Sequence, residues 1–503
     1  MTSDYNPESS RPPPQLPVGN SSSLRGVTEN FSFHSSPEAF ITSRVQQWQS
    51  ENASASNPRT PIRAKILNRN VAVVSSYKQI QAILNASRND SGESGSQPPY
   101  VASQAYDELM TEFFPPPNLL LSDGCPHARM RNVWDERMES LHALVLGSQS
   151  SASSVVASFF NDGSCVPLNS PIDLYETMKK LAWRILLDTF LGLSPDRDDK
   201  LFAEVQSLHE DLLRGQFSLM PISVNTKIFR SPRSKGIHAR KKLQGVITHR
   251  LQALQGDRAA DRTVGGADGS GRRRPFLDVQ GQQQMDEVRD HVLMMTSSLA
   301  AKGLASLLTA FFLNLFIFEM GGVKIADDLK ALAERGQIDQ RRKVLRSIYL
   351  ETERLSPPIV GVMRRVTRDM VVDGGDGEAG TLLPKDWDVW MYFVGGGRDP
   401  AVFGESCSSF EPLRYMSDDV PEPLGFGAGA KPCLGKNFVR DIVLLTGEHC
   451  LTSGWSMEGD ISKAGLKAWL GWADAAPEKW EADMKQLPTQ HPTAPVMVRF
   501  AQQ

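Results

Sequence analysis

The stretch Phe426-Gly-Ala-Gly-Ala-Lys-Pro-Cys-Leu-Gly435 places one cysteine in a glycine-rich loop directly before an apolar helical pattern. Backbone N–H groups at the start of a helix point toward such a sulfur, and with the helix dipole they favour the thiolate. Gly429 and Gly435 permit tight turns and a close approach of the backbone to a flat cofactor. Phe426 lies seven residues before Cys433 and is expected to pack near it. The loop therefore predicts that Cys433 is a thiolate ligand.

The whole string resembles the haem-binding loop of the cytochrome P450 family, whose pattern is Phe-x-x-Gly-x-Arg-x-Cys-x-Gly. The resemblance implies haem b (iron protoporphyrin IX) as cofactor, Cys433 as its axial metal ligand, and Phe426 and Gly429 as cofactor-binding residues. Lys431 stands where the family usually has Arg, which implies a charge near a haem propionate. An inert cysteine in a turn is the alternative for Cys433 taken alone. No such context surrounds the other cysteines, which are Cys125, Cys165, Cys407 and Cys450.

Two further segments resemble a structural triad of the same family. Glu351-Thr-Glu-Arg354 places its two ends on one helix face, where they can pair. Phe410-Glu-Pro-Leu-Arg414 resembles the family's Phe-x-Pro-x-Arg segment. The resemblance implies that Glu351, Arg354 and Arg414 form a buried cluster that holds the loop of Cys433. A surface ion pair is the alternative for the first segment alone.

Cationic residues also stand where the family contacts the haem propionates. Asp123-Gly-Cys-Pro-His-Ala-Arg-Met-Arg131 resembles the start of a family helix. His127 and Arg131 are then one turn apart and can both reach propionates through charge-assisted hydrogen bonds. Arg364 matches the family's propionate arginine, with the adjacent Arg365 as the alternative.

The stretch 292–318 is apolar enough to suggest a membrane span. A charge such as Lys302 inside a span costs about 2.5–3.5 kcal/mol on insertion scales, so a buried central helix is favoured. The segment matches the family's central helix, whose Ala-Gly-x-Asp/Glu-Thr-Thr/Ser string delivers protons to dioxygen at the haem. One alignment puts Gly303 and Leu304 at the acid and alcohol positions, and an ungapped one puts Ala301 and Lys302 there. In neither alignment does the chain carry both the acid and the alcohol of the family string.

Polar residues on this apolar helix form one stripe made of Ser298, Lys302, Ser306 and Thr309. One interpretation pairs Lys302 with an acid on a neighbouring helix. The other makes Lys302 a candidate catalytic residue that faces the cavity and donates protons or binds an anionic substrate group.

The composition bounds the class of protein. The chain has 503 residues, 22% of them charged and 40% hydrophobic, with a formal net charge of −3. This balance argues against a nucleic-acid partner. Five cysteines in such a length argue for a reducing compartment, and the first 23 residues carry no secretory signal, so we expect a cytoplasmic protein.

We expect residues 1–58 to be a mobile tail and lead-in, and residues 59–503 to be a single large domain, mainly α with a minor β portion. Turn-rich composition predicts loops at 86–104 and 256–275. Hydrophobic periodicity predicts a hairpin at 61–74 and a final strand at 496–500. It also predicts helices at 75–85, 127–145, 172–193, 197–215, 234–255, 292–318, 327–334, 340–355 and 435–451.

The resemblance implies a haem-thiolate monooxygenase. From the sequence itself we expect a soluble protein without a membrane span, and its polar tail and loops are in the style of fungal specialised metabolism. Its substrate would be a mid-sized hydrophobic metabolite, held beneath the loop 98–121 and the apolar helix. Electrons would come from an NADPH-dependent reductase. Two alternatives stay open. One is a peroxide- or hydroperoxide-dependent isomerase, dehydratase or peroxygenase of the same fold, and the other is a non-enzymatic haem sensor or carrier.

Overall fold

The computed structural model describes most of the chain. The described residues are 25–51, 60–66, 69–87, 98–146, 151–218, 230–264, 281–373, 380–472 and 482–502, with Pro12, Val224 and Trp480.

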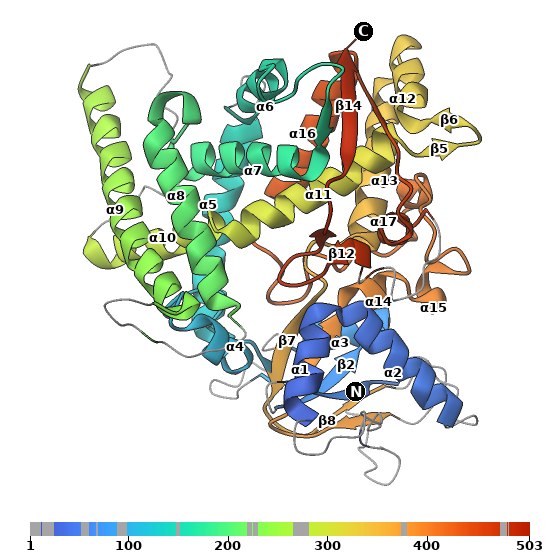
Figure 1. Ribbon diagram of the computed structural model, residues 1–503. Coiled ribbons are helices and arrows are strands. Elements are labelled where there is room, and N and C mark those ends of the chain that lie inside the picture. The colour runs from blue at the N-terminus through green and yellow to red at the C-terminus, as the bar shows by residue number, and fades with distance from the viewer. Residues whose placement is uncertain are drawn as a thin grey trace.

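Helices make up most of the described chain, and one of them crosses its centre. Helix α11 (Ser298–Phe316) runs between α7 (Leu174–Leu191), α13 (Ile338–Leu355) and α16 (Lys436–Thr452), all of which it contacts (Figure 1). A helix that is apolar on every side is stable only when it is surrounded by protein or lipid. Here the surroundings are the other helices of the fold.

The largest sheet lies at one end of the molecule and carries the β portion (Figure 1). Its five strands follow the order β1 (Ile62–Ile66), β2 (Arg69–Val74), β10 (Asp388–Tyr392), β7 (Gly361–Val366) and β3 (Tyr100–Val101). Strands β2 and β10 are parallel, and the other neighbours are antiparallel. The fold is therefore mainly α with a minor β portion, as predicted.

The other elements complete the helical body and four small sheets. Apart from α1, α2 and α10, which are described below, the other helices are α3 (Tyr77–Ala86), α4 (Ser103–Met110), α5 (Gly124–Leu146), α6 (Ser151–Asn161), α8 (Pro195–Gln216), α9 (Pro232–Val264), α12 (Ile325–Glu334), α14 (Phe393–Gly397), α15 (Pro400–Phe403), η2 (Arg414–Met416) and α17 (Ala464–Leu470). The other strands are β4 (Pro171–Asp173), β5 (Glu319–Met320), β6 (Val323–Lys324), β8 (Met370–Val372), β9 (Thr381–Leu383), β11 (Trp455–Gly459), β12 (Met484–Lys485), β13 (His491–Pro492) and β14 (Met497–Gln502).

The predicted hairpin, the predicted final strand and most predicted helices are confirmed to within a few residues. The prediction of one continuous helix over 292–318 was wrong, because the chain forms α10 (Gln282–Met295) and then α11. The break lies at Thr296 and Ser297, where the Ser297 hydroxyl accepts the Ala300 N–H at 3.2 Å and caps α11. The loop expected at 256–275 was wrong as far as Val264, where α9 ends, and its remainder lies outside the described residues.

Part of the expected lead-in before residue 59 is helical, and the rest of residues 1–58, apart from Pro12, lies outside the described residues. Residues 25–51 form α1 (Arg25–Ser35) and α2 (Pro37–Glu51), and the ring of Phe33 lies 4.6 Å from that of Trp390 in the sheet. The Glu29 carboxylate accepts the Lys65 N–H of β1 at 2.7 Å. These contacts join the segment to the sheet.

Within the described residues, one helical segment is long and apolar enough to cross a membrane by length and composition, Gln282–Phe316. Of its apolar window, 78% is buried inside the protein. This burial agrees with the interpretation of a central core helix.

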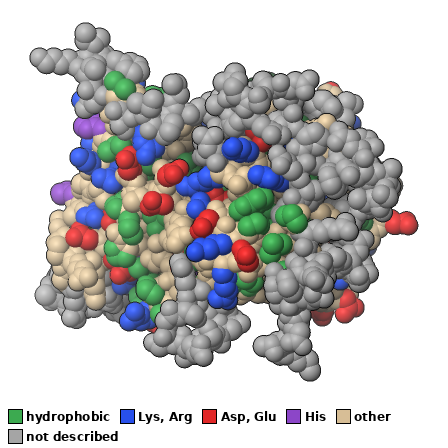
Figure 2. All heavy atoms as spheres, turned by 90° about the horizontal axis from the view of Figure 1, so that it is seen from below, with side chains coloured by type: hydrophobic (Ala, Val, Ile, Leu, Met, Phe, Trp, Pro, Cys, Tyr) green, Lys and Arg blue, Asp and Glu red, His purple; other side chains and the backbone are tan. Residues whose placement is uncertain are grey.

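Figure 2 shows one face of the surface, on which acidic and basic side chains alternate around apolar ones. This face carries no extended patch of one sign among its described residues.

Candidate haem-thiolate site

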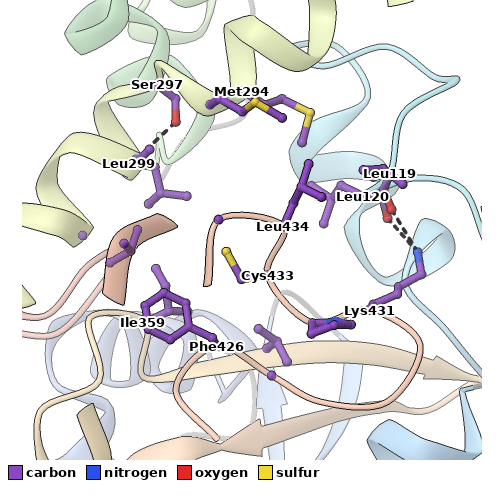
Figure 3. A pocket seen from close by; sticks show the side chains of 18 of the residues that line it. Leu119, Leu120, Met294, Ser297, Leu299, Ile359, Phe426, Lys431, Cys433 and Leu434 are labelled. Atoms are coloured by element: carbon purple, nitrogen blue, oxygen red, sulfur yellow. Dashed lines mark hydrogen bonds between the residues drawn. The ribbon is translucent and has the colours of Figure 1, made fainter. Parts of the chain in front are cut away.

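The loop of Cys433 is closed by backbone hydrogen bonds and leads into α16. The Cys433 N–H donates to the Phe426 carbonyl at 2.7 Å, and the Lys436 N–H donates to the Cys433 carbonyl at 3.2 Å. The sulfur points into a cavity (Figure 3), so its accessible surface faces this interior space. Burial raises the pKa of the Cys433 thiol, whereas a hydrogen bond from the Gly435 N–H acts to lower it. The loop therefore presents a shielded sulfur with a backbone donor beside it.

Two glycines of this loop adopt backbone conformations that other residues rarely reach. Gly427 has φ +72° and Gly429 has φ +68°. A Cβ on Gly429 would collide with the Leu84 carbonyl of α3. Gly429 is not among the residues that line the cavity, and its predicted contact with the cofactor stays a prediction. It packs the loop against α3, and Gly427 is the left-handed glycine at the cavity wall.

The cavity holds about 430 Å³ and has mostly apolar walls. One wall is the cysteine loop, including Phe426, and the opposite wall comes from the α10–α11 junction (Figure 3). The predicted substrate walls are both present, since residues of 98–121 and of the apolar helix line the space. The apolar lining outside the cysteine loop includes Leu119, Leu120, Met294, Met295, Leu299, Ala300, Leu304, Pro358, Ile359 and Val362.

The four residues expected at the propionates all line this cavity. They are His127, Arg131, Arg364 and Lys431. Burial, followed by the charges of Lys431 and Arg131, lowers the pKa of His127 to about 4, so its ring is neutral at neutral pH. The structure thus brings these four residues together, and they form a largely cationic edge of the cavity.

The two candidate arginines of β7 have different surroundings. Arg364 is buried, donates to the Met363 carbonyl at 2.7 Å, and leaves its Nε without a hydrogen-bond partner within the described chain. Arg365 instead pairs with Asp388 at 2.6 Å and does not line the cavity. The orphaned donor of Arg364 favours it as the anion-binding arginine.

Lys431 makes contacts that the sequence pattern did not indicate. Its ammonium pairs with Asp123 at 3.0 Å and donates to the carbonyls of Leu119 and Leu120, both at 3.3 Å, and of Ser122 (Figure 3). Burial lowers its pKa to about 8. Lys431 therefore ties the cysteine loop to the segment before α5, at the edge where a propionate was expected.

The expected triad is assembled in the structure. Arg354 contacts the Glu351 carboxylate at 2.8 Å and 2.6 Å, and Arg414 contacts it at 3.1 Å. The side chains of Glu351 and Arg354 have no exposed surface. The surface ion pair considered as an alternative is therefore excluded for this pair.

Lys302 lies on the side of α11 away from the cavity, and the candidate catalytic role was wrong. Its ammonium pairs with Glu210 of α8 at 2.8 Å, and Ser298 donates to the same carboxylate at 2.6 Å. Burial acts to raise the pKa of Glu210, but the bonds from Lys302 and Ser298 outweigh it and lower the pKa. The interpretation with an acid on a neighbouring helix is the one that the structure supports.

Replacing Lys302 with methionine should leave haem content and the carbon monoxide spectrum unchanged, because the side chain does not reach the cavity. The free energy of unfolding should fall by about 1 kcal/mol, the range for a partly exposed ion pair. Denaturant titration and the haem-to-protein absorbance ratio measure both. Loss of haem from this variant would contradict the placement of Lys302.

Several cavity residues carry no motif and were not predicted individually. They include Tyr106, His291, Met294, Ser297 and Ile359. Their sequence context is ordinary, and only the meeting of distant segments brings them to one space.

These residues fit an iron porphyrin. A sulfur occupies one wall, the remaining walls are largely apolar, and the cationic edge contains an orphaned Arg364 donor suited to carboxylates. Within the described residues no cluster of three or more His, Cys, Asp or Glu side chains offers a competing metal site. The fold and this site together define a haem-thiolate protein.

Comparison with known proteins agrees with a haem-thiolate site. The family model for cytochrome P450 matches residues 337–451, which include the triad helix and the cysteine loop. The chain is 24% identical to cytochrome P450 26A1 of Danio rerio, over 60% of this chain and 62% of that protein. It is 24% identical to cytochrome P450 90D2 of Oryza sativa subsp. japonica, over 71% of this chain and 70% of that protein. These matches identify the chain as similar to members of the cytochrome P450 family.

Solved structures show the same fold. The retinoic acid-bound cyanobacterial CYP120A1 superposes with a TM-score of 0.69 at 17% identity, covering 98% of this chain and 100% of that chain. Cytochrome P450EX alpha (CYP152N1) with myristic acid gives a TM-score of 0.63 at 14% identity, with the same coverage. The alignments to the first two curated relatives span only 62% and 58% of those proteins.

Proposed function

We propose that this protein is a cytoplasmic haem-thiolate oxidoreductase that oxidises a mid-sized apolar metabolite of specialised metabolism with electrons from an NADPH-dependent reductase. The observation that carries the proposal is the sulfur of Cys433, which faces an apolar cavity with cationic groups at one edge. The expected single domain from residue 59 to 503 is part of the same proposal.

Bound haem would supply the oxidising chemistry, and a thiolate ligand to its iron would favour that chemistry. Cys433 would ligate the iron, and the Gly435 N–H would stabilise its negative charge. Arg131 and Arg364 would bind the propionates through charge-assisted bonds, with neutral His127 as a further donor. The apolar walls would exclude water and orient an apolar substrate.

The wall formed by the central helix is short of proton donors. Gly303 and Leu304 line the cavity, and neither side chain carries a proton to give. Ser306 donates to the Gln490 carbonyl and Thr309 to the Ala305 carbonyl at 2.7 Å, so both hydroxyls are engaged away from the cavity. We infer that substrate groups, water or the Ser297 hydroxyl, which lines the same wall, supply the proton that the acid and threonine supply elsewhere in the family.

The same feature favours a second candidate, a peroxide- or hydroperoxide-dependent enzyme of this fold. Such chemistry brings its own oxygen–oxygen bond and needs no proton delivery to dioxygen. The two candidates therefore differ in the oxidant that they consume. The third candidate, a haem sensor or carrier, differs in giving no turnover at all.

The choice of oxidant is tested by product formation. Purified holoprotein is incubated with a panel of apolar metabolites, retinoic acid and myristic acid among them, and either NADPH with a reductase or hydrogen peroxide. We expect product, identified by mass spectrometry, with NADPH and reductase only. Equal turnover with peroxide alone would replace the proposal by the second candidate. A chain that binds haem and is inert to both oxidants would favour a sensor or carrier. Cys433→Ser protein is the blank for both reactions.

A further inference from the structure

The loop 115–122, which supplies Leu119 and Leu120 to the cavity wall, is attached to the fold from two opposite sides. On one side, the carbonyls of both leucines accept from Lys431 of the cysteine loop. On the other side, the Leu119 N–H donates to Nε2 of His291 on α10 at 3.3 Å. Leu119 is thus tied through its carbonyl to one wall of the cavity and through its amide to the wall opposite.

The rest of the loop is organised by its own side chains. The Asn118 amide group donates to the carbonyls of Phe114 and Pro115, and its oxygen accepts from the N–H groups of Leu120 and Leu121 at 3.0 and 2.9 Å. These bonds shape the turn but do not anchor it to α10. Within the described residues, the hydrogen bond between this loop and α10 is the one to His291.

The chemistry of its two partners determines the protonation state of His291. Its Nδ1 lies 2.8 Å from the Glu287 carbonyl, which only accepts, so Nδ1 carries the hydrogen. Its Nε2 faces the Leu119 N–H, which only donates, so Nε2 must be bare. The bond therefore requires the neutral ring with one tautomer.

The ring itself is held rigidly. His291 is 2% exposed and stacks on Trp134 of α5, with 4.5 Å between ring centroids. The Trp134 indole donates to the Glu287 carboxylate at 3.0 Å. The ring of His291 also lines the cavity. Packing alone would not require a histidine at this position, whereas both ring nitrogens of His291 make hydrogen bonds.

We propose that His291 is a positioning residue that clamps the loop 115–122 to α10 and so determines how Leu119 and Leu120 shape the substrate wall. This proposal depends on the proposed function only in assuming that the cavity binds an apolar substrate. The hydrogen bond itself is a property of this chain with or without that activity.

The clamp should release in acid. Protonation would place an Nε2 hydrogen against the Leu119 N–H and convert an attraction into a repulsion. Burial lowers the pKa of His291. Glu287 and Asp290 on its own helix act to raise the pKa, and Arg137 of α5 acts to lower it. Because burial moves the pKa of His291 below the ordinary histidine value, the neutral form is held at neutral pH, and the clamp is lost only as the pH falls through that lowered pKa.

Hydrogen exchange tests the clamp directly. Residues 115–117 are prolines, so a fragment covering 115–122 reports on few amides, Leu119 among them. His291→Phe keeps a stacking ring but removes the acceptor, and His291→Gln offers an uncharged amide oxygen instead. We expect exchange in this fragment about threefold to tenfold faster in His291→Phe than in wild type at the same pH, the range for one neutral hydrogen bond. His291→Gln should stay close to wild type.

The control is His449→Phe, which alters a half-buried histidine of α16 whose buried Nε2 has no hydrogen-bond partner in the described chain. Its loop exchange should match wild type. Equal exchange in wild type and His291→Phe overturns the proposal. Fast exchange in His291→Gln as well, or in His449→Phe, overturns it too, since general packing would then hold the loop.

Binding of a haem ligand tests whether the clamp shapes the substrate wall. An aryl-substituted 1,2,4-triazole stays uncharged between about pH 5 and pH 8, the histidine range, and its binding is read from the haem spectrum. Its Kd in wild type should be constant near neutral pH and rise about threefold to tenfold in acid, whereas in His291→Gln it should be independent of pH. The same acid response in both proteins overturns the role at the substrate wall. Absence of haem would defeat the proposed function, and the exchange experiment would still decide the clamp.

Discussion

Replacing Cys433 with serine should abolish the thiolate-type absorption of the reduced carbon monoxide complex. The sulfur is the one thiol among the lining residues of the cavity, and a hydroxyl in its place is a far weaker ligand that stays protonated near neutral pH. The absorption of wild-type and variant holoprotein under carbon monoxide, after reduction with dithionite, is the measurement. Activity with any oxidant should fall to the blank.

The matched control is Cys125→Ser. Cys125 is exposed at the start of α5, two residues before His127, and does not line the cavity. Its spectrum should equal that of wild type. A thiolate-type spectrum that survives in Cys433→Ser would mean that another cysteine ligates the iron, and a histidine-type spectrum in wild type would refute the haem-thiolate site itself.

Local patterns were sufficient for the parts of the site that lie within one loop or one helix. The cysteine loop and the Glu351–Arg354 pair each depend on spacing along the chain, which a sequence displays directly. Arg414 needed the family resemblance as well, because its partner Glu351 lies 63 residues away in the sequence. Arg364 needed it because its expected partner is a cofactor carboxylate rather than a residue of the chain.

Other parts depend on which distant segments meet, and spacing does not encode this. Lys302 could face the cavity or α8 by periodicity alone, and the acceptor on Glu210 decided the outcome. Lys431 pairs with Asp123 and donates to loop carbonyls, contacts that its expected position beside a propionate did not include. The break in the central helix has a similar origin. Ser297 caps α11 and His209 of α8 lies 3.2 Å from the Thr296 hydroxyl, contacts that hydropathy does not reveal.

The second large effect is expected from replacing Arg354 with methionine. The guanidinium serves the Glu351 carboxylate and also the carbonyls of Gly397, Cys407 and Ser409. Its loss leaves a buried carboxylate with Arg414 as its remaining cationic partner, and removing one member of such a pair costs about 3–5 kcal/mol. Denaturant titration should show this loss.

The consequence for the site follows from where those carbonyls lie. They belong to residues 397–409, from the end of α14 to just before η2, a segment that precedes the cysteine loop in the chain, so Arg354→Met should also reduce haem retention. Lys179→Met is the matched control, because it breaks an exposed pair with Glu176 worth about 0.2–0.5 kcal/mol. If the two variants lose similar amounts of stability, the triad does not contribute as a buried charge cluster. If Arg354→Met is unstable but holds haem at the wild-type ratio, the triad supports the fold without positioning the loop of Cys433.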